Sequence, residues 1–227
     1  MSLSFILVEP AVPENIGAAA RAIKTMGFHE LRLVNPSDHL ADKAVWLAHG
    51  SKDVLDKATL FNSFRDSIAD LDFIIGTTAK RRSAKYDYYT PEEALKIVEK
   101  KGDTISKVGI VFGREESGLK NEELALCDIA SSIPLSNPYP SINLGQCVML
   151  YAYVFSVVRS KSEAQGAGGS ERLYLELKAG TRQILDKLDS SDDSILYHRI
   201  MERIATVNED DARLFLSYAK KFNRKFE

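Results

Sequence analysis

Cysteine is scarce in this sequence, and the features of a secreted or membrane-spanning chain are missing. The only two cysteines, Cys127 and Cys147, both lie in apolar segments. We interpret them as reduced core residues of a cytoplasmic protein. No stretch reaches the roughly 18 continuous apolar residues of a membrane span. Met1 leads directly into a short strand pattern, without a basic flank or a cleavage site, so we expect neither a signal peptide nor a membrane span.

A strong net charge is also absent, because the formal net charge is −2. This excludes a uniformly basic nucleic-acid binder, so any binding of this kind must use local patches. Two basic clusters occur: Lys80, Arg81, Arg82 and Lys85, and then Lys220, Lys221, Arg224 and Lys225. Each of them is either a solvated surface or a local patch that binds nucleic acid.

Several common catalytic motifs are missing. No G-x-G-x-x-G follows a strand, so an ordinary dinucleotide site is not expected. Gly113 and Gly118 have the glycine spacing of a P-loop. Leu119-Lys120-Asn121 follows, however, in place of the required Lys and Ser or Thr, so a binding site for a nucleoside triphosphate is not expected. The four histidines show no ligand spacing, and H-E-x-x-H and G-x-S-x-G are absent. We therefore predict no metal site and no serine hydrolase.

Apolar runs of strand length alternate with amphipathic segments over the first two thirds of the chain. This alternation predicts an α/β fold with a mainly parallel sheet. The predicted strands are 3–8, 31–34, 73–78, 108–112 and 129–133. The predicted helices are 14–26, 41–48, 60–71, 90–101, a short one after Lys120, and a long apolar one at 141–158.

The composition changes near residue 160. Residues 160–170 are rich in Ser, Gly and Ala, which is typical of a flexible linker. Residues 171–227 contain three helical patterns, and the last one interleaves aromatic and cationic residues, which suits either RNA or a helix core. We predict an α/β domain at 1–159, a linker at 160–170, and a helical domain at 171–227 that binds RNA or supports a dimer.

The loop from Ser132 to Gln146 contains three prolines and two asparagines. A proline-rich turn is by default only a connector. Ligands of parallel sheets bind outside the carboxyl ends of the strands, however, and this loop follows the fifth strand. We expect it to meet the polar loops after Val8, Gly76 and Phe112 and to form one wall of a binding site.

Gly17 and Arg21 lie four residues apart on the first predicted helix, hence on one face. The Arg21 side chain would then lean over the bare backbone at Gly17 and reach the strand ends. A helical glycine costs about 1 kcal/mol relative to alanine, so we expect a close approach there. The alternative is a surface arginine beside a packing glycine.

Three separated motifs together resemble the SpoU-type branch of the SPOUT methyltransferases, and within it the TrmJ-like tRNA 2′-O-ribose methyltransferases. The resemblance covers roughly residues 3 to 158. Each motif alone is weak, whereas three in order, each at a strand end, are specific. They are Asn15-Ile16-Gly17 with Arg21 to Gly27, Val111 to Glu115 with Gly118-Leu119, and Ile133-Pro134 with Asn137-Pro138 and Ser141 to Leu144.

This resemblance implies a deep trefoil knot at the carboxyl end of the α/β domain, an obligate homodimer, and S-adenosylmethionine held by the knot loops. It also implies phosphate contacts from Arg82 and Arg114. The implied cofactor contacts are Thr77, Thr78, Ala79, Gly113, Ile133, Pro140, Ser141 and Ile142.

The implied reaction is attack of an RNA ribose 2′-hydroxyl on the methyl group, with Arg21 as the catalytic residue. A guanidinium has a pKa above about 12, so Arg21 suits stabilisation of an alkoxide better than proton abstraction. Asn15, Glu115 and Asn143 would orient Arg21 and the hydroxyl. The expected substrate is tRNA, at nucleotide 32 of the anticodon loop. Ribosomal RNA and a knotted RNA-binding protein without catalysis remain as alternatives.

Overall fold

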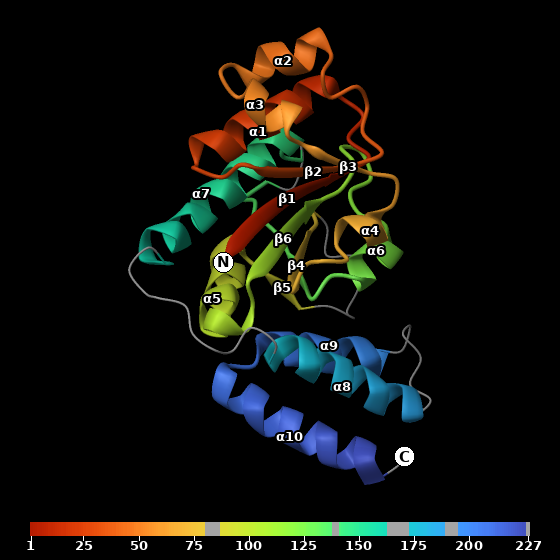
Figure 1. The fold of residues 1–227 in the computed structure, drawn as a ribbon. Helices are drawn as coiled ribbons and strands as arrows, with labels where there is room; N and C mark the ends of the chain where they lie inside the picture. The colour runs from red at the N-terminus through yellow and green to blue at the C-terminus, as the bar shows by residue number, and fades with distance from the viewer. Residues whose placement is uncertain (80–86, 138–140, 163–172, 189–194, 226–227) are drawn as a thin grey trace.

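A computed structural model of the chain describes residues 1–79, 87–137, 141–162, 173–188 and 195–225. Its centre is a seven-stranded parallel sheet with the order β3-β2-β1-β6-β4-β7-β5 (Figure 1). This confirms the predicted α/β fold with a parallel sheet. The strands are β1 (Ser2–Val8), β2 (Glu30–Val34), β3 (Thr59–Phe61), β4 (Phe73–Thr77), β5 (Tyr88–Tyr89), β6 (Lys107–Phe112) and β7 (Ile129–Ser131).

Helices cover both faces of the sheet, because alternate residues of each strand point to opposite sides. Phe5 of β1 packs in a cluster with the helices of one face, whereas Ile6 packs with those of the other face. The first face carries α1 (Pro13–Thr25), α2 (Asp42–Ala48), α3 (Lys52–Asp56), α5 (Pro91–Lys101) and α7 (Leu144–Ser162). The second carries α4 (Phe64–Ser67) and α6 (Asn121–Ala125).

Local signals define the ends of α1 and α5. Pro13 occupies the start of α1, where its missing N–H costs nothing, and Gly27 follows the helix with φ +82°. The side chain of Thr90 accepts a hydrogen bond from the Glu93 amide, and the Glu93 carboxylate accepts one from the Thr90 amide. This capping box holds the first turn of α5.

The sequence prediction was wrong at the short elements. The helix predicted at 60–71 is instead the edge strand β3 followed by the single turn of α4. Strand β5 and helix α3 were not predicted. Helix α7 begins at Leu144 rather than Ser141, and it continues to Ser162, into the predicted linker. Residues 163–172 of that linker lie outside the described part of the chain.

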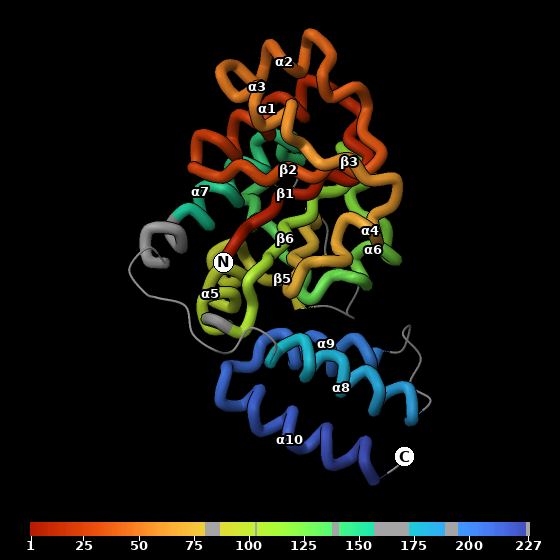
Figure 2. Tube along the Cα trace, in the orientation of Figure 1, coloured from red at the N-terminus to blue at the C-terminus, as the bar shows by residue number. Residues whose placement is uncertain are grey.

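Three further helices, α8 (Leu173–Lys187), α9 (Ile195–Thr206) and α10 (Glu209–Lys225), form a separate layer (Figure 2). They pack at the amino ends of strands. Asp128, just before β7, accepts a hydrogen bond from the Tyr174 hydroxyl at 3.2 Å and pairs with Lys178 at 2.5 Å. Among the described helices, none is long and apolar enough to cross a membrane.

Candidate active site

The carboxylate of Glu115 joins the end of β6 to the start of α1. It accepts hydrogen bonds from the backbone amides of Ala11 at 3.1 Å and Val12 at 3.3 Å, and from the Asn15 side-chain amide at 2.9 Å. These contacts connect two of the three sequence motifs at the carboxyl edge of the sheet. The third motif joins through Asn15.

The Oδ1 atom of Asn15 accepts a hydrogen bond from Nδ2 of Asn143 at 2.8 Å. The Oδ1 atom of Asn143 in turn accepts from the backbone amide of Gly145 at 2.9 Å and caps α7. An ionised carboxylate can only accept, so Glu115 requires Asn15 to present its NH₂ group. Asn15 therefore presents its oxygen to Asn143, and the orientation of both amides follows from Glu115.

The protonation state of Glu115 fits this role. Burial raises its pKa, but hydrogen bonds from Asn15 and from the Ala11 and Val12 amides outweigh burial, so the pKa lies below its ordinary value. The carboxylate is therefore ionised near neutral pH and occupied as an acceptor. This arrangement suits orientation of neighbouring groups, the role that the family resemblance implies for Glu115, better than proton abstraction.

Gly113 follows β6 directly, and the chain folds back over it. A Cβ at this position would lie 2.1 Å from the carbonyl carbon of Gly118 and 2.2 Å from the nitrogen of Leu119. The loop itself therefore requires glycine here, independently of any ligand. Backbone hydrogen bonds between Arg114 and Gly118 in both directions close the loop.

The guanidinium of Arg114 lies between two carboxylates, and its side chain is 15% exposed. Its Nε and Nη2 atoms contact Glu9 at 2.8 and 2.7 Å, and its Nη1 and Nη2 atoms contact Glu123 at 3.0 and 2.9 Å. Nη1 also donates to the Gly118 carbonyl at 3.3 Å. The five N–H donors of the side chain thus face five acceptors. This geometry speaks against the predicted phosphate contact of Arg114.

Arg21 lies on the outer face of α1 and is exposed. It lies six residues after Asn15, which is about 9 Å along the helix and about 120° around it. It makes no hydrogen bond or ion pair with the described residues. Gly17 instead packs on α2, where a Cβ would lie 2.1 Å from the Ala44 carbonyl oxygen. Within one subunit, Arg21 is thus a surface arginine and Gly17 is a packing glycine, and the reach of Arg21 to the strand ends stays a prediction.

Five of the predicted cofactor residues lie at the ends of three adjacent strands: Thr77, Thr78 and Ala79 at β4, Gly113 after β6 and Ile133 after β7. Strand β4 lies between β6 and β7, with Gly76 opposite Val111 and Thr77 opposite Ser131. Thr77 is buried, and the Thr78 amide donates to the Ser131 carbonyl at 2.9 Å. Ile133 and Ile142 are half-buried, whereas Ala79 and Ser141 are exposed. Pro140 and Arg82 lie outside the described residues.

The sequence reasoning missed Glu9 and Glu123. Glu9 follows β1 at the same sheet edge as Arg114, and its φ of +48° is unusual for a residue other than glycine. Glu123 is buried at the start of α6. An acidic residue immediately after the first predicted strand was the only available signal, and its partner lies 105 residues away.

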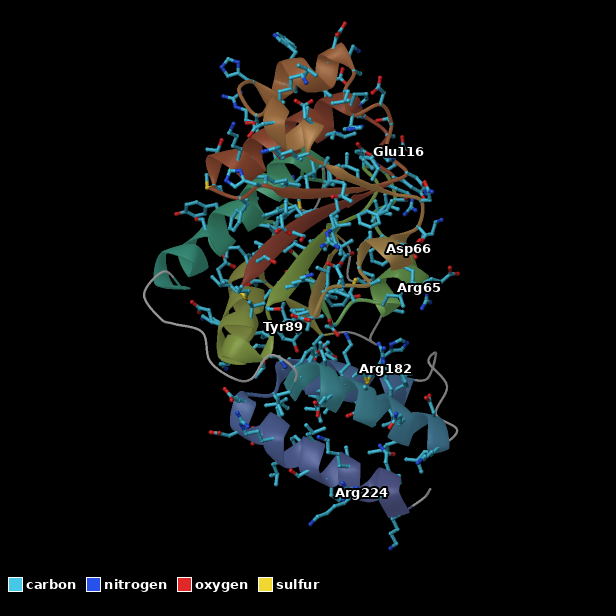
Figure 3. The ribbon with its side chains drawn as sticks, viewed as in Figure 1. Arg65, Asp66, Tyr89, Glu116, Arg182 and Arg224 are labelled. Carbon is cyan, nitrogen blue, oxygen red and sulfur yellow. The ribbon has the colours of Figure 1, made fainter. Side chains whose placement is uncertain are left out.

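The site and the C-terminal helices lie at opposite ends of the molecule. Glu116, next to Glu115, lies in the upper part of Figure 3, whereas Arg182 of α8 and Arg224 of α10 lie in its lower part. Among the described residues, no group of three or more His, Cys, Asp or Glu could hold a metal ion.

Comparison with known proteins identifies the family. Residues 2–153 match the SpoU rRNA Methylase family. The chain is 41% identical over 215 residues to the uncharacterized tRNA/rRNA methyltransferase LasT of Escherichia coli K12, and the match covers 94% of both chains. It is 42% identical over 165 residues to tRNA (cytidine-2′-O-)-methyltransferase TrmJ of Methanocaldococcus jannaschii, which covers 70% of both chains.

A similar solved structure shows the same fold over the whole chain. The crystal structure of TrmJ from Z. mobilis ZM4 is 26% identical, covers 98% of this chain and 100% of its own, and superposes with a TM-score of 0.67. Together with the three motifs at the strand ends, these matches show that the chain belongs to the SpoU rRNA methylase family.

Proposed function

We propose that the protein transfers a methyl group from S-adenosylmethionine to the ribose 2′-hydroxyl of a tRNA, at nucleotide 32 of the anticodon loop, in the cytoplasm. Family membership supports methyl transfer to RNA, and the similarity to the tRNA (cytidine-2′-O-)-methyltransferase of M. jannaschii supports tRNA. The hydrogen-bond chain from Glu115 through Asn15 to Asn143 carries the proposal. A protein that only binds RNA has no need of this chain.

S-adenosylmethionine fits the loops after β4, β6 and β7. These loops offer backbone amides and carbonyls beside the half-buried side chains of Ile133 and Ile142, which suits an adenine ring and a ribose without charged side chains. The residues that would hold it are Thr77, Thr78, Ala79, Gly113, Ile133, Pro140, Ser141 and Ile142. The proposal includes the trefoil knot that the family resemblance implies around these loops.

When bound, S-adenosylmethionine would supply an electrophilic methyl group to the ribose 2′-hydroxyl; its sulfur would keep the electron pair of the carbon–sulfur bond, and the hydroxyl proton would pass to solvent. The protein positions the hydroxyl and stabilises the charge that develops on its oxygen. Arg21 provides the positive charge, while Asn15, Glu115 and Asn143 fix the geometry around the oxygen.

A homodimer explains how Arg21 reaches a site. Helix α7 is apolar around its circumference, yet Leu150 is 41% and Tyr153 is 63% exposed. Such a helix normally needs a partner on each side. Helix α7 also packs closely on α1, since a Cβ at Gly145 would lie 2.7 Å from Ala18 Cβ. A second copy that covers the exposed side of α7 would meet Arg21 on the neighbouring face of α1, and Arg21 would enter the partner's site.

The C-terminal helices offer a surface for RNA. Leu214 and Tyr218 are exposed on α10, and Lys221 and Arg224 follow on the same helix. Stacking of bases on an aromatic ring beside cations is a common mode of RNA binding. We include this surface and Arg82 in the proposed contact with tRNA.

One experiment tests the proposed function. Purified protein is incubated with labelled S-adenosylmethionine and separated RNA fractions, and the labelled nucleotide is mapped. We expect label on a ribose at nucleotide 32 of tRNA. Label in ribosomal RNA alone would establish the alternative substrate, and absence of label in every fraction would support an RNA-binding protein without catalysis.

A further inference from the structure

The Glu9–Arg114–Glu123 network joins three separate elements. Glu9 ends β1, Arg114 follows β6, and Glu123 lies in α6. Glu9 and Glu123 share one guanidinium, and burial of Glu123 is opposed by hydrogen bonds from Arg114 and the Lys120 amide, so the pKa of Glu123 lies below its ordinary value. The hydrogen bond to Arg114 also lowers the pKa of Glu9. All three groups are therefore charged at neutral pH.

The backbone of Glu9 is held in a costly conformation. Its φ of +48° lies in the left-handed region, which is unfavourable for a residue other than glycine. Its amide donates to the Val34 carbonyl at 2.8 Å, and its carboxylate contacts Arg114 with both oxygens. These contacts offset the strain and turn the chain toward Ala11 and Val12, whose amides bind Glu115.

We propose that Glu9, Arg114 and Glu123 are positioning residues for methyl transfer. Their network fixes the Gly113–Gly118 loop against the end of β1, so that Glu115 holds the start of α1 and orients Asn15 and Asn143. The inference rests on the proposed function, because these residues can act in positioning only if the protein catalyses methyl transfer. It assigns Arg114 to the interior of the site, in place of a contact with RNA.

Charge and burial favour this assignment over phosphate binding. A phosphate would have to displace at least one carboxylate from a guanidinium whose donors are all occupied. Glu123, with its side chain 12% exposed, would then lose its partner in a partly buried place. Removing one partner of a buried ion pair is strongly unfavourable, because the other charge is left uncompensated.

The test compares Arg114→Lys and Arg114→Met with Arg32→Lys. Arg32 is a matched control, because its side chain is 13% exposed and pairs with both oxygens of Asp70 away from the site. We expect Arg114→Met to lower kcat about 100-fold at saturating tRNA, and KM for both substrates to change less than about threefold. Arg114→Lys should recover part of kcat, while Arg32→Lys should keep it.

Hydrogen exchange provides a second measurement that needs no RNA. In Arg114→Met, the Ala11 and Val12 amides should exchange at least about tenfold faster, while those of β1 keep their protection. Unchanged exchange at Ala11 and Val12 would overturn the inference. A raised KM for tRNA with unchanged kcat, and a weaker salt dependence of binding, would also overturn it and would establish the phosphate contact. A wild-type protein that methylates no RNA would instead overturn the proposed function.

Discussion

The ammonium group of Lys101 lies 3.9 Å from the centroid of the Tyr174 ring, where α5 meets the C-terminal helices. Lys101 is only 2% exposed and donates a hydrogen bond to the Ile204 carbonyl at 3.2 Å. Burial lowers the pKa of Lys101 to about 7, although the nearby Asp128 carboxylate favours the charged form and Lys178 opposes it. The contact between the two parts of the chain therefore depends on a buried amine.

This burial predicts a pH dependence of stability. The pKa of Lys101 is about 7 in the folded protein against 10.5 for the free side chain, so folding releases a proton between these values. Folding stability thus rises from about pH 7 to about pH 10.5, and the contribution is lost as the pH falls through this window. The free energy of unfolding should change by about 1.4 kcal/mol per pH unit in this window. Between pH 7.5 and 9 we therefore expect the free energy of unfolding of the wild type to rise by roughly 2 kcal/mol more than that of Lys101→Met.

Urea denaturation of both proteins across this range measures the difference. Burial raises the pKa of Tyr174 well above its ordinary value of 10, so this phenol stays protonated in the folded protein between pH 7.5 and 9. Lys100→Met is the control, because the neighbouring Lys100 is exposed. Parallel pH curves for wild type and Lys101→Met would contradict the prediction.

Asn15→Asp should inactivate the enzyme without a change of shape. The new carboxylate would lie about as far from Glu115 as the Asn15 amide does now, at 2.9 Å. Two carboxylates at such a short distance cannot both stay ionised. We expect kcat to fall at least about 100-fold at pH 8 and to recover in part near pH 6, where the pair takes up a proton. Asn208→Asp, at the start of α10, should leave the pH profile of kcat unchanged.

Arg21→Ala should abolish methyl transfer, while cofactor affinity and dimerisation persist. If Arg21 acts in the partner's site, a heterodimer of Arg21→Ala with Asn15→Asp contains one intact site. We expect such a heterodimer, purified with two different tags, to regain about half of the wild-type activity. An inactive heterodimer would show that Arg21 acts within its own subunit. Arg65→Ala, on α4, is the control for loss of an exposed arginine.

Tyr153→Lys should dissociate the proposed dimer. Tyr153 is 63% exposed on α7, and a cation there would be desolvated against its own symmetry mate. Tyr218→Lys is a matched control, because Tyr218 is 67% exposed on α10. Analytical ultracentrifugation should detect a monomer for Tyr153→Lys and a dimer for Tyr218→Lys. A dimer in both variants would place the interface elsewhere.

Gly17→Ala should destabilise the fold by about 2–4 kcal/mol, because the new Cβ would overlap the Ala44 carbonyl oxygen and force α1 and α2 apart. Gly180→Ala is the opposite case. Its Cβ would approach Ala219 Cβ at 3.4 Å, and alanine favours the helix by up to about 1 kcal/mol. Denaturation midpoints of the two variants should therefore move in opposite directions, and equal midpoints would refute the assigned packing role of Gly17.

The sequence by itself determined the long elements and the family. Strands β1, β4 and β6 are apolar runs that stay buried on both faces, and α1 and α5 carry proline, glycine and capping signals within their own segments. These signals are local, so they can be read without the fold. The three motifs were recognisable for the same reason, since each lies within one short segment of the chain.

Only the tertiary structure decided the short elements and the partners of the charged groups. The two-residue strand β5 and the edge strand β3 are stabilised by neighbouring strands, and no local period marks them. Arg114 contacts Glu9 across 105 residues, although the family resemblance had implied a phosphate contact. Coulomb attraction and burial depend on distance in space, and the path of the chain through the sheet brings these carboxylates to the guanidinium.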